Sequence, residues 1–129
     1  MKLIVCVDKT NGLSFNHRRQ SRDRAVVADI AAHYAPVRMS AASAPLFAAW
    51  PEHIAVSEDF LTAAKPGEAC FAEALPLPDV PEELILYRWD RDYPADERLP
   101  YDLSRWNLCS AEPLAGHSHA LITKEIYTK

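Results

Sequence analysis

The feature that most constrains the fold is an unbroken apolar run from Leu3 to Val7. It consists of aliphatic residues and one cysteine, and β-branched residues dominate it. Asp8 follows at once, and then the turn-forming residues Asn11 and Gly12. A short apolar run bounded by turn residues is typical of a buried central strand. The sequence therefore predicts a sheet that has this strand in its interior.

An amphipathic helix is expected after this turn. Ser21 is a candidate N-cap, because a serine side chain accepts a hydrogen bond from a free backbone N–H of the first helical turn. Pro36 marks the far boundary, since helical backbone is disfavoured just before a proline. Between these two residues the apolar side chains recur at helical spacing, at Val26, Val27, Ile30, Ala31 and Tyr34. The segment therefore predicts a helix with one apolar face.

The rest of the chain predicts further strands with short helical segments between them. Strands are expected at residues 37–41, 54–56, 69–72 and 84–89, and short helical segments at 43–50 and 57–61. Prolines at 76, 78 and 81 oppose a helix there, and residues 90–98 have the composition of an exposed loop. Residues 105–110 and 120–127 predict an antiparallel hairpin joined through Gly116. The fold class is therefore α/β, a mixed sheet with flanking helices in a single domain, residues 1–129.

Composition bounds the class of protein and its surroundings. With 129 residues, 49% hydrophobic and 25% charged, the chain is average for one globular domain. Its net charge of −4 excludes a surface built wholly for nucleic acid. Nothing approaches the ~20 apolar residues of a membrane span, so no membrane partner and a cytoplasmic location are expected. Cys6, Cys70 and Cys109 are an odd number without a CxxC pair, so reduced thiols are expected, with Cys6 inert in the core.

The strongest charge contrast is a basic segment at residues 17–24. It holds Arg18, Arg19, Arg22 and Arg24 against one acid, Asp23. Guanidinium groups bind phosphate or carboxylate in a bidentate manner, and a following helix N-terminus adds N–H donors. The segment, Gln20 included, is therefore a candidate anion site. The alternative is a solvated helix start whose arginines pair with the acidic stretch 79–98.

Two histidines, His117 and His119, share one side of the chain if the backbone is extended there. Two imidazoles are too few for a metal site, and no third ligand stands at a diagnostic spacing. The pair is therefore interpreted as part of a loop that leads into the last strand. No metal is expected.

Both ends of the chain resemble dihydrofolate reductase. Residues 3–14, LIVCVDKTNGLS, resemble the first strand of that family and the start of its active-site loop. Residues 84–89, followed by Asp96-Glu97-Arg98-Leu99-Pro100 and Trp106, are similar to the region where an Asp-Thr-x-Phe-Pro element precedes a tryptophan strand. Residues 106–127 look like the closing hairpin. The resemblance implies a shortened dihydrofolate-reductase-like fold.

The resemblance also implies roles for individual residues. Asp23 falls where the family places the carboxylate that binds the pterin, and is thus the candidate catalytic residue. Elsewhere the chain departs from the family. Ser40-Ala41-Ala42-Ser43 replaces the Gly-Arg-Lys-Thr segment that grips the cofactor phosphates, and Cys70-Phe71-Ala72-Glu73 replaces the Gly-Gly turn. Backbone N–H groups approach a pyrophosphate closely where no side chain intervenes, so NADPH is not expected to bind in the familiar way.

Three functions are compatible with these residues. The first is binding of a small anionic or nucleotide-like ligand by Arg18, Arg19, Gln20, Arg22 and Arg24, without reductase activity. The second is a divergent NADPH-dependent oxidoreductase in which Asp23 polarises a pterin-like heterocycle. The third is an RNA or protein interaction module that uses the basic segment. A homodimer through an exposed edge strand is also compatible with the pattern.

Overall fold

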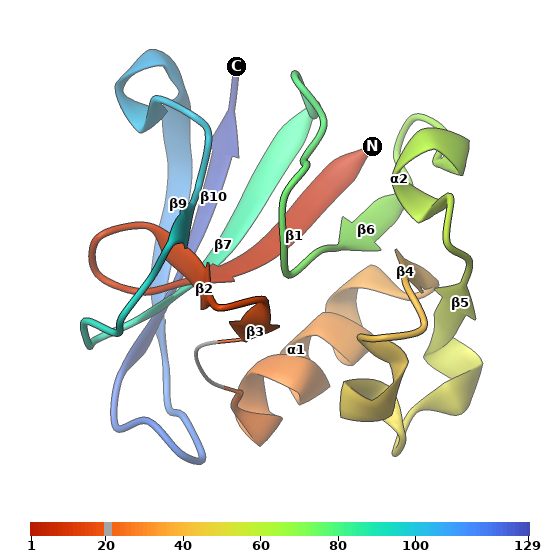
Figure 1. Ribbon diagram of the computed structural model, residues 1–129, viewed down its shortest axis with the longest axis horizontal. Coiled ribbons are helices and arrows are strands. Elements are labelled where there is room, and N and C mark those ends of the chain that lie inside the picture. The colour runs from red at the N-terminus through yellow and green to blue at the C-terminus, as the bar shows by residue number, and fades with distance from the viewer. Residues whose placement is uncertain (20–21) are drawn as a thin grey trace.

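The apolar run at residues 3–7 forms the centre of a seven-stranded sheet. The computed structural model describes residues 1–19 and 22–129. Strand β1 has parallel partners on both edges, β6 and β7, as a central strand requires. In spatial order the strands are β5 (Ile54–Val56), β4 (Val37–Met39), β6 (Ala69–Phe71), β1 (Lys2–Val7), β7 (Glu83–Trp89), β10 (Ile122–Thr128) and β9 (Asn107–Leu114) (Figure 1).

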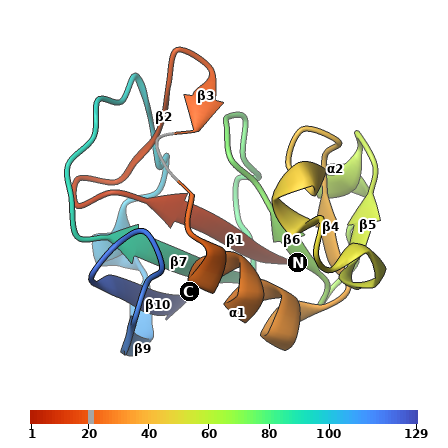
Figure 2. The same ribbon diagram turned by 90° about the horizontal axis from the view of Figure 1, so that it is seen from below.

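This sheet is buried on both faces. Along β1, Leu3, Val5 and Val7 belong to one apolar cluster and Ile4 belongs to the other. The Ile4 face is covered by helix α1, and the opposite face by segments that include Leu13. Figure 2 shows α1 on one side of β1 and strands β2 and β3 on the other. The absence of polar positions from the run follows from this double covering.

Helix α1 (Arg24–Tyr34) forms as predicted, but with a different N-cap. The side chain of Asp23 accepts a hydrogen bond of 2.8 Å from the backbone N–H of Ala25. The prediction of Ser21 as the N-cap is therefore wrong, and Ser21 itself lies outside the described residues. A carboxylate fulfils the capping role at least as well as a hydroxyl, because its charge also interacts favourably with the helix dipole.

The short helical segments are 3₁₀ turns more often than α-helices. Residues 43–50, expected as one helix, contain the single 3₁₀ turn η1 (Ala44–Phe47), and Pro51 begins a second one, η2 (Pro51–His53). Pro51 directly follows the expected helical segment and starts a turn of its own, because proline fits the first helical position, whose N–H has no partner in the helix. Helix α2 (Phe60–Ala63) overlaps the end of the segment expected at residues 57–61 and continues beyond it.

The carboxyl-terminal hairpin is confirmed. Strands β9 and β10 pair antiparallel, and β10 adds to β7, which makes the sheet mixed. The two edges of the sheet are β5 and β9. A homodimer through either edge stays a prediction. Within the described residues, no helix is long and apolar enough to cross a membrane.

The sequence did not predict the second sheet. It has three antiparallel strands in the order β3 (Arg18–Arg19), β2 (Gly12–Phe15) and β8 (Glu97–Arg98). Residues 90–96 form the expected loop, and most of them are exposed. The interpretation is wrong only at its end, where residues 97–98 form β8. The loop is also tied down, because the backbone N–H of Tyr93 donates to the buried carboxylate of Asp8. Two-residue strands have no detectable period, so their pairing appears only in the tertiary structure. A 3₁₀ turn, η3 (Leu103–Arg105), precedes β9.

Candidate ligand cleft

An open cleft of about 720 Å³ lies beyond the carboxyl ends of β4 and β6. In α/β sheets this edge is where ligands bind, because the loops that follow the parallel strands converge there. The segment after β4 and the segment after β6 form two walls, and the small sheet and the start of α2 form the others. The polar lining residues are Ser14, His17, Arg18, Arg19, Ser40, Ser43, Glu58 and Glu73.

Two carboxylates of the chain itself accept hydrogen bonds from donors in and beside this cleft. Glu73 accepts from Arg19 Nε at 2.7 Å and from Arg19 Nη2 at 3.0 Å, and it also accepts from Ser43 Oγ at 2.7 Å. Glu58 accepts from the backbone N–H of Ala41 at 3.0 Å. The hydrogen bonds that Arg19 donates to Glu73 raise the pKa of Arg19, so this guanidinium is charged throughout the pH range in which proteins fold.

The four arginines of the basic segment are distributed over two hollows of the surface, and their role as an anion site stays a prediction. Arg18 and Arg19 line the cleft. Arg22 and Arg24 line a separate groove of about 410 Å³ between the start of α1 and the residues around η1. Gln20 lies outside the described residues. The alternative of pairing with the acidic stretch 79–98 is not what Arg19 does, since its partner Glu73 precedes that stretch.

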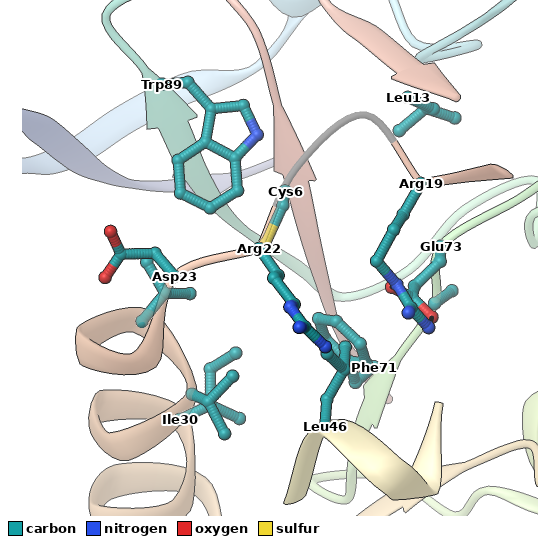
Figure 3. A pocket seen from close by; sticks show the side chains of 13 residues that line it. Cys6, Leu13, Arg19, Arg22, Asp23, Ile30, Leu46, Phe71, Glu73 and Trp89 are labelled. Carbon is teal, nitrogen blue, oxygen red and sulfur yellow. Dashed lines mark hydrogen bonds and ion pairs between the residues drawn. The ribbon is translucent and has the colours of Figure 1, made fainter. Parts of the chain in front are cut away.

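Arg22 and Arg19 also line a narrow cavity between the sheet and α1. Figure 3 shows both guanidinium groups directed into this region, while the carboxylate of Asp23 points away from them. The cavity has a volume of about 20 Å³, which is space for about one water molecule. It therefore does not hold a heterocycle in this conformation.

The carboxylate of Asp23 is hydrogen-bonded to the loop before β10. Its side chain is fully buried, and it accepts hydrogen bonds from three consecutive backbone N–H groups of the loop before β10. These bonds are 2.9 Å from His117, 2.6 Å from Ser118 and 3.0 Å from His119. Together with Ala25, four backbone donors surround one carboxylate. Asp23 thus joins the start of α1 to the carboxyl-terminal hairpin.

This environment also determines the charge of Asp23. Burial alone would raise its pKa, but the hydrogen bonds from His117, Ser118, Ala25 and His119 outweigh burial and lower the pKa to about 2. A general acid needs a pKa near the working pH. The predicted catalytic role of Asp23 stays a prediction, and the geometry describes a structural anchor.

The two histidines diverge. His117 is exposed, whereas His119 is buried, stacks on Trp89 with ring centroids 4.4 Å apart, and lies 2.8 Å from the hydroxyl of Tyr93 through Nε2. The two side chains do not share one side, because the backbone wraps around Asp23 and is not extended. The interpretation of the pair as part of a loop that leads into the last strand is confirmed. Among the residues that the structure describes, no three metal-ligating side chains gather.

Gly116 makes this wrapping possible. A Cβ atom at position 116 would lie 2.1 Å from the carbonyl oxygen of His119 and 3.0 Å from Asp23 Oδ2. The first distance is shorter than any van der Waals contact, and the second is tighter than most Cβ contacts. The loop can close over the carboxylate because this residue has no side chain.

The three cysteines are free thiols, and their environments predict unequal reactivity. Burial, with the nearby charges of Glu73 and Asp23, raises the pKa of the Cys6 thiol far above its ordinary value, and Cys70 is buried and shifted in the same direction. Cys109 is exposed. In native protein, Ellman's reagent should therefore label about one thiol rapidly and the others after unfolding. Fast labelling of Cys109→Ser would contradict this assignment.

Sequence reasoning identified Arg18 and Arg19 but not the carboxylates and hydroxyls around them. Glu73 stands 54 residues from Arg19 along the chain and 30 residues from Ser43. No local pattern links such positions. The replacement of a Gly-Gly turn by Ala72-Glu73 was the one available signal, and it pointed to a lost phosphate contact without indicating the new ion pair.

Comparison with known proteins adds the last observation. No family model matches the sequence, and no curated protein does. The structure is similar to dihydrofolate reductase from Enterococcus faecalis, solved with NADP(H), with a TM-score of 0.61 at 9% sequence identity. The alignment covers 98% of this chain and 94% of that chain. This chain therefore has the fold of dihydrofolate reductase, an α/β domain around a mixed sheet.

Proposed function

We propose that the cleft binds a small anionic or nucleotide-like ligand and that the chain has no reductase activity. The observation that carries the proposal is the composition of the cleft: Arg18 and Arg19 offer guanidinium donors opposite an apolar wall that includes Phe60 and Leu61. Such a cleft can hold an aromatic base against the apolar wall and an anionic group against the arginines. The similar reductase was solved with NADP(H), which supports a nucleotide-like ligand for this chain.

The state of Asp23 supports binding over reduction. A carboxylate that polarises a heterocycle must face it, yet Asp23 is buried beneath the 116–119 loop with backbone donors around it. The oxidoreductase alternative would require this loop to open. The RNA alternative has less support, because Arg18 and Arg19 line the cleft whereas Arg22 and Arg24 line a separate groove.

Titration calorimetry with ADP tests the proposal. We expect saturable binding that Arg18→Gln weakens about tenfold, the amount that corresponds to one charge-assisted hydrogen bond. Arg91→Gln is the matched control, since Arg91 is also exposed but lies in the β7–β8 connection and not among the lining residues of the cleft. Equal affinities in the two variants, or the absence of ADP binding, would contradict the proposal.

Fluorescence of NADPH distinguishes the oxidoreductase alternative. If the cofactor fluorescence changes saturably on mixing and the change is lost in Asp23→Asn, the alternative is favoured. Folding of that variant must be verified by circular dichroism, because Asp23 is also a structural anchor. A saturable change that Asp23→Asn leaves intact, and that Arg18→Gln weakens, would instead support nucleotide binding in the cleft.

A further inference from the structure

The cleft contains an anion of its own. The carboxylate of Glu73 lies at the carboxyl end of β6 and bridges Arg19 and Ser43, which come from β3 and from the segment after β4. Both bonds from Arg19 are short, so the pairing is bidentate, the strongest form of carboxylate recognition by arginine. In this conformation the two best donors of the cleft are already engaged.

We propose that Glu73 is an internal competitor that determines which ligands the cleft accepts. An anionic group reaches Arg19 and Ser43 by displacing the Glu73 carboxylate, so the observed affinity for such a group is reduced by the free energy of that displacement. The inference rests on the proposed function, because it concerns the same cleft. Its consequence is selectivity: a phosphate, with close to two negative charges and three acceptor oxygens, displaces Glu73 more readily than a single carboxylate does.

Displacement of Glu73 is feasible because the Arg19–Glu73 pair is only partly buried. The side chain of Arg19 is 34% exposed and that of Glu73 is 20% exposed. A released Glu73 can therefore turn toward solvent without leaving a buried charge unpaired, which would be costly in a fully buried pair. Arg19 also donates to the carbonyl oxygen of Ala42 at 3.2 Å, so its guanidinium has a second contact that holds it in the cleft when Glu73 leaves.

The same chain offers a matched ion pair away from the cleft. Arg38 on β4 pairs with Glu68, with an Nε–Oε1 distance of 3.2 Å and an Nη2–Oε2 distance of 3.2 Å. Neither residue lines the cleft. Neutralising Glu68 therefore changes the net charge by the same amount and releases an arginine of similar exposure, but at a different place. Figure 3 shows the tested pair, Arg19 and Glu73, side by side.

The experiment measures ADP and adenosine binding by calorimetry to wild-type protein, Glu73→Gln and Glu68→Gln. We expect Glu73→Gln to bind ADP about tenfold more tightly, since it no longer has to displace an ion pair. The affinity for adenosine, which has no phosphate, should stay unchanged, and Glu68→Gln should behave as wild type. In the double variant Arg19→Gln with Glu73→Gln the gain should disappear.

The modification of Arg19 by phenylglyoxal gives a readout that does not depend on a ligand. Arg19 should react faster in Glu73→Gln than in wild type, and Arg18 is the reference in the same protein. Peptide mass spectrometry measures the extent of modification at each arginine.

ADP affinity that is unchanged by Glu73→Gln, with wild-type binding intact, would overturn the role of Glu73 and leave the proposed function standing. Equal gains in Glu73→Gln and Glu68→Gln would also overturn it. Failure of every variant to bind ADP would overturn both proposals.

Discussion

Asp23→Ala is expected to lower the free energy of unfolding by about 3 kcal/mol or more. The substitution removes the N-cap of α1 and leaves the backbone N–H groups of His117, Ser118 and His119 without their acceptor. A buried donor that loses its partner costs about 1–3 kcal/mol. Urea denaturation monitored by circular dichroism at pH 7 measures the difference from wild type.

The matched control is Asp102→Ala. Asp102 also caps a helical turn by accepting from a backbone N–H two residues ahead, that of Ser104, but its side chain is 62% exposed. Water replaces it as an acceptor, so a loss below about 1 kcal/mol is expected. A comparable loss in both variants would show that Asp23 acts as an ordinary cap and that its bonds to the hairpin loop contribute nothing.

The pH dependence provides a second check on Asp23→Ala. The pKa of this carboxyl is about 2 in the folded protein and 3.8 ordinarily, so the unfolded chain binds the proton more tightly. The resulting stabilisation, about 2 kcal/mol, is fully present above about pH 4 and is lost as the pH falls toward 2. The difference in stability between wild type and the variant should therefore shrink over this range. A constant difference would contradict the lowered pKa.

Phe47→Ala is expected to lower the free energy of unfolding by about 3–5 kcal/mol. Phe47 lies in η1, has no exposed surface, and packs edge to face on Phe71 with ring centroids 5.5 Å apart. Its removal leaves a cavity between the sheet and the segment that forms one wall of the cleft. Thermal and urea unfolding measure the loss.

The chain supplies a matched phenylalanine for this test. Phe15 at the end of β2 is 52% exposed, so Phe15→Ala removes little buried surface and should cost less than about 1 kcal/mol. Similar losses of unfolding free energy at both positions would contradict the tight packing of Phe47 against the sheet. If Phe47→Ala also weakens ADP binding while Phe15→Ala does not, η1 supports the cleft wall as the structure indicates.

Sequence patterns were sufficient wherever an element is long or strongly apolar. β1, α1, β7 and the carboxyl-terminal hairpin were all predicted, because periodicity or an apolar run spans each of them. The boundaries were less exact: α1 begins at Arg24, after Asp23, and of residues 43–50 only Ala44–Phe47 form a helical turn, which is 3₁₀. The small sheet of β2, β3 and β8 was missed, since strands of two to four residues are specified by their partners and not by their own sequence.

The candidate site was predictable in its charge and not in its geometry. The arginine-rich segment is visible in the chain, but nothing local shows that Arg19 pairs with Glu73, or that Arg22 lines the groove beside α1 and not the cleft. The backbone at Asp23 is extended, and in extended backbone neighbouring side chains point to opposite sides, so Arg22 and Asp23 diverge (Figure 3).

The central strand, the mixed α/β sheet and the basic segment were therefore determined by the sequence alone, because each depends on residue types that are adjacent or periodic in the chain. The tertiary structure decided the roles of Asp23 and Glu73. Asp23 lies 94 to 96 residues before its hairpin partners, and Glu73 lies 54 residues after Arg19. The sequence does not distinguish a carboxylate that binds a ligand from one that accepts hydrogen bonds from a loop or pairs with an arginine. Its role depends on which distant donors the fold brings to it.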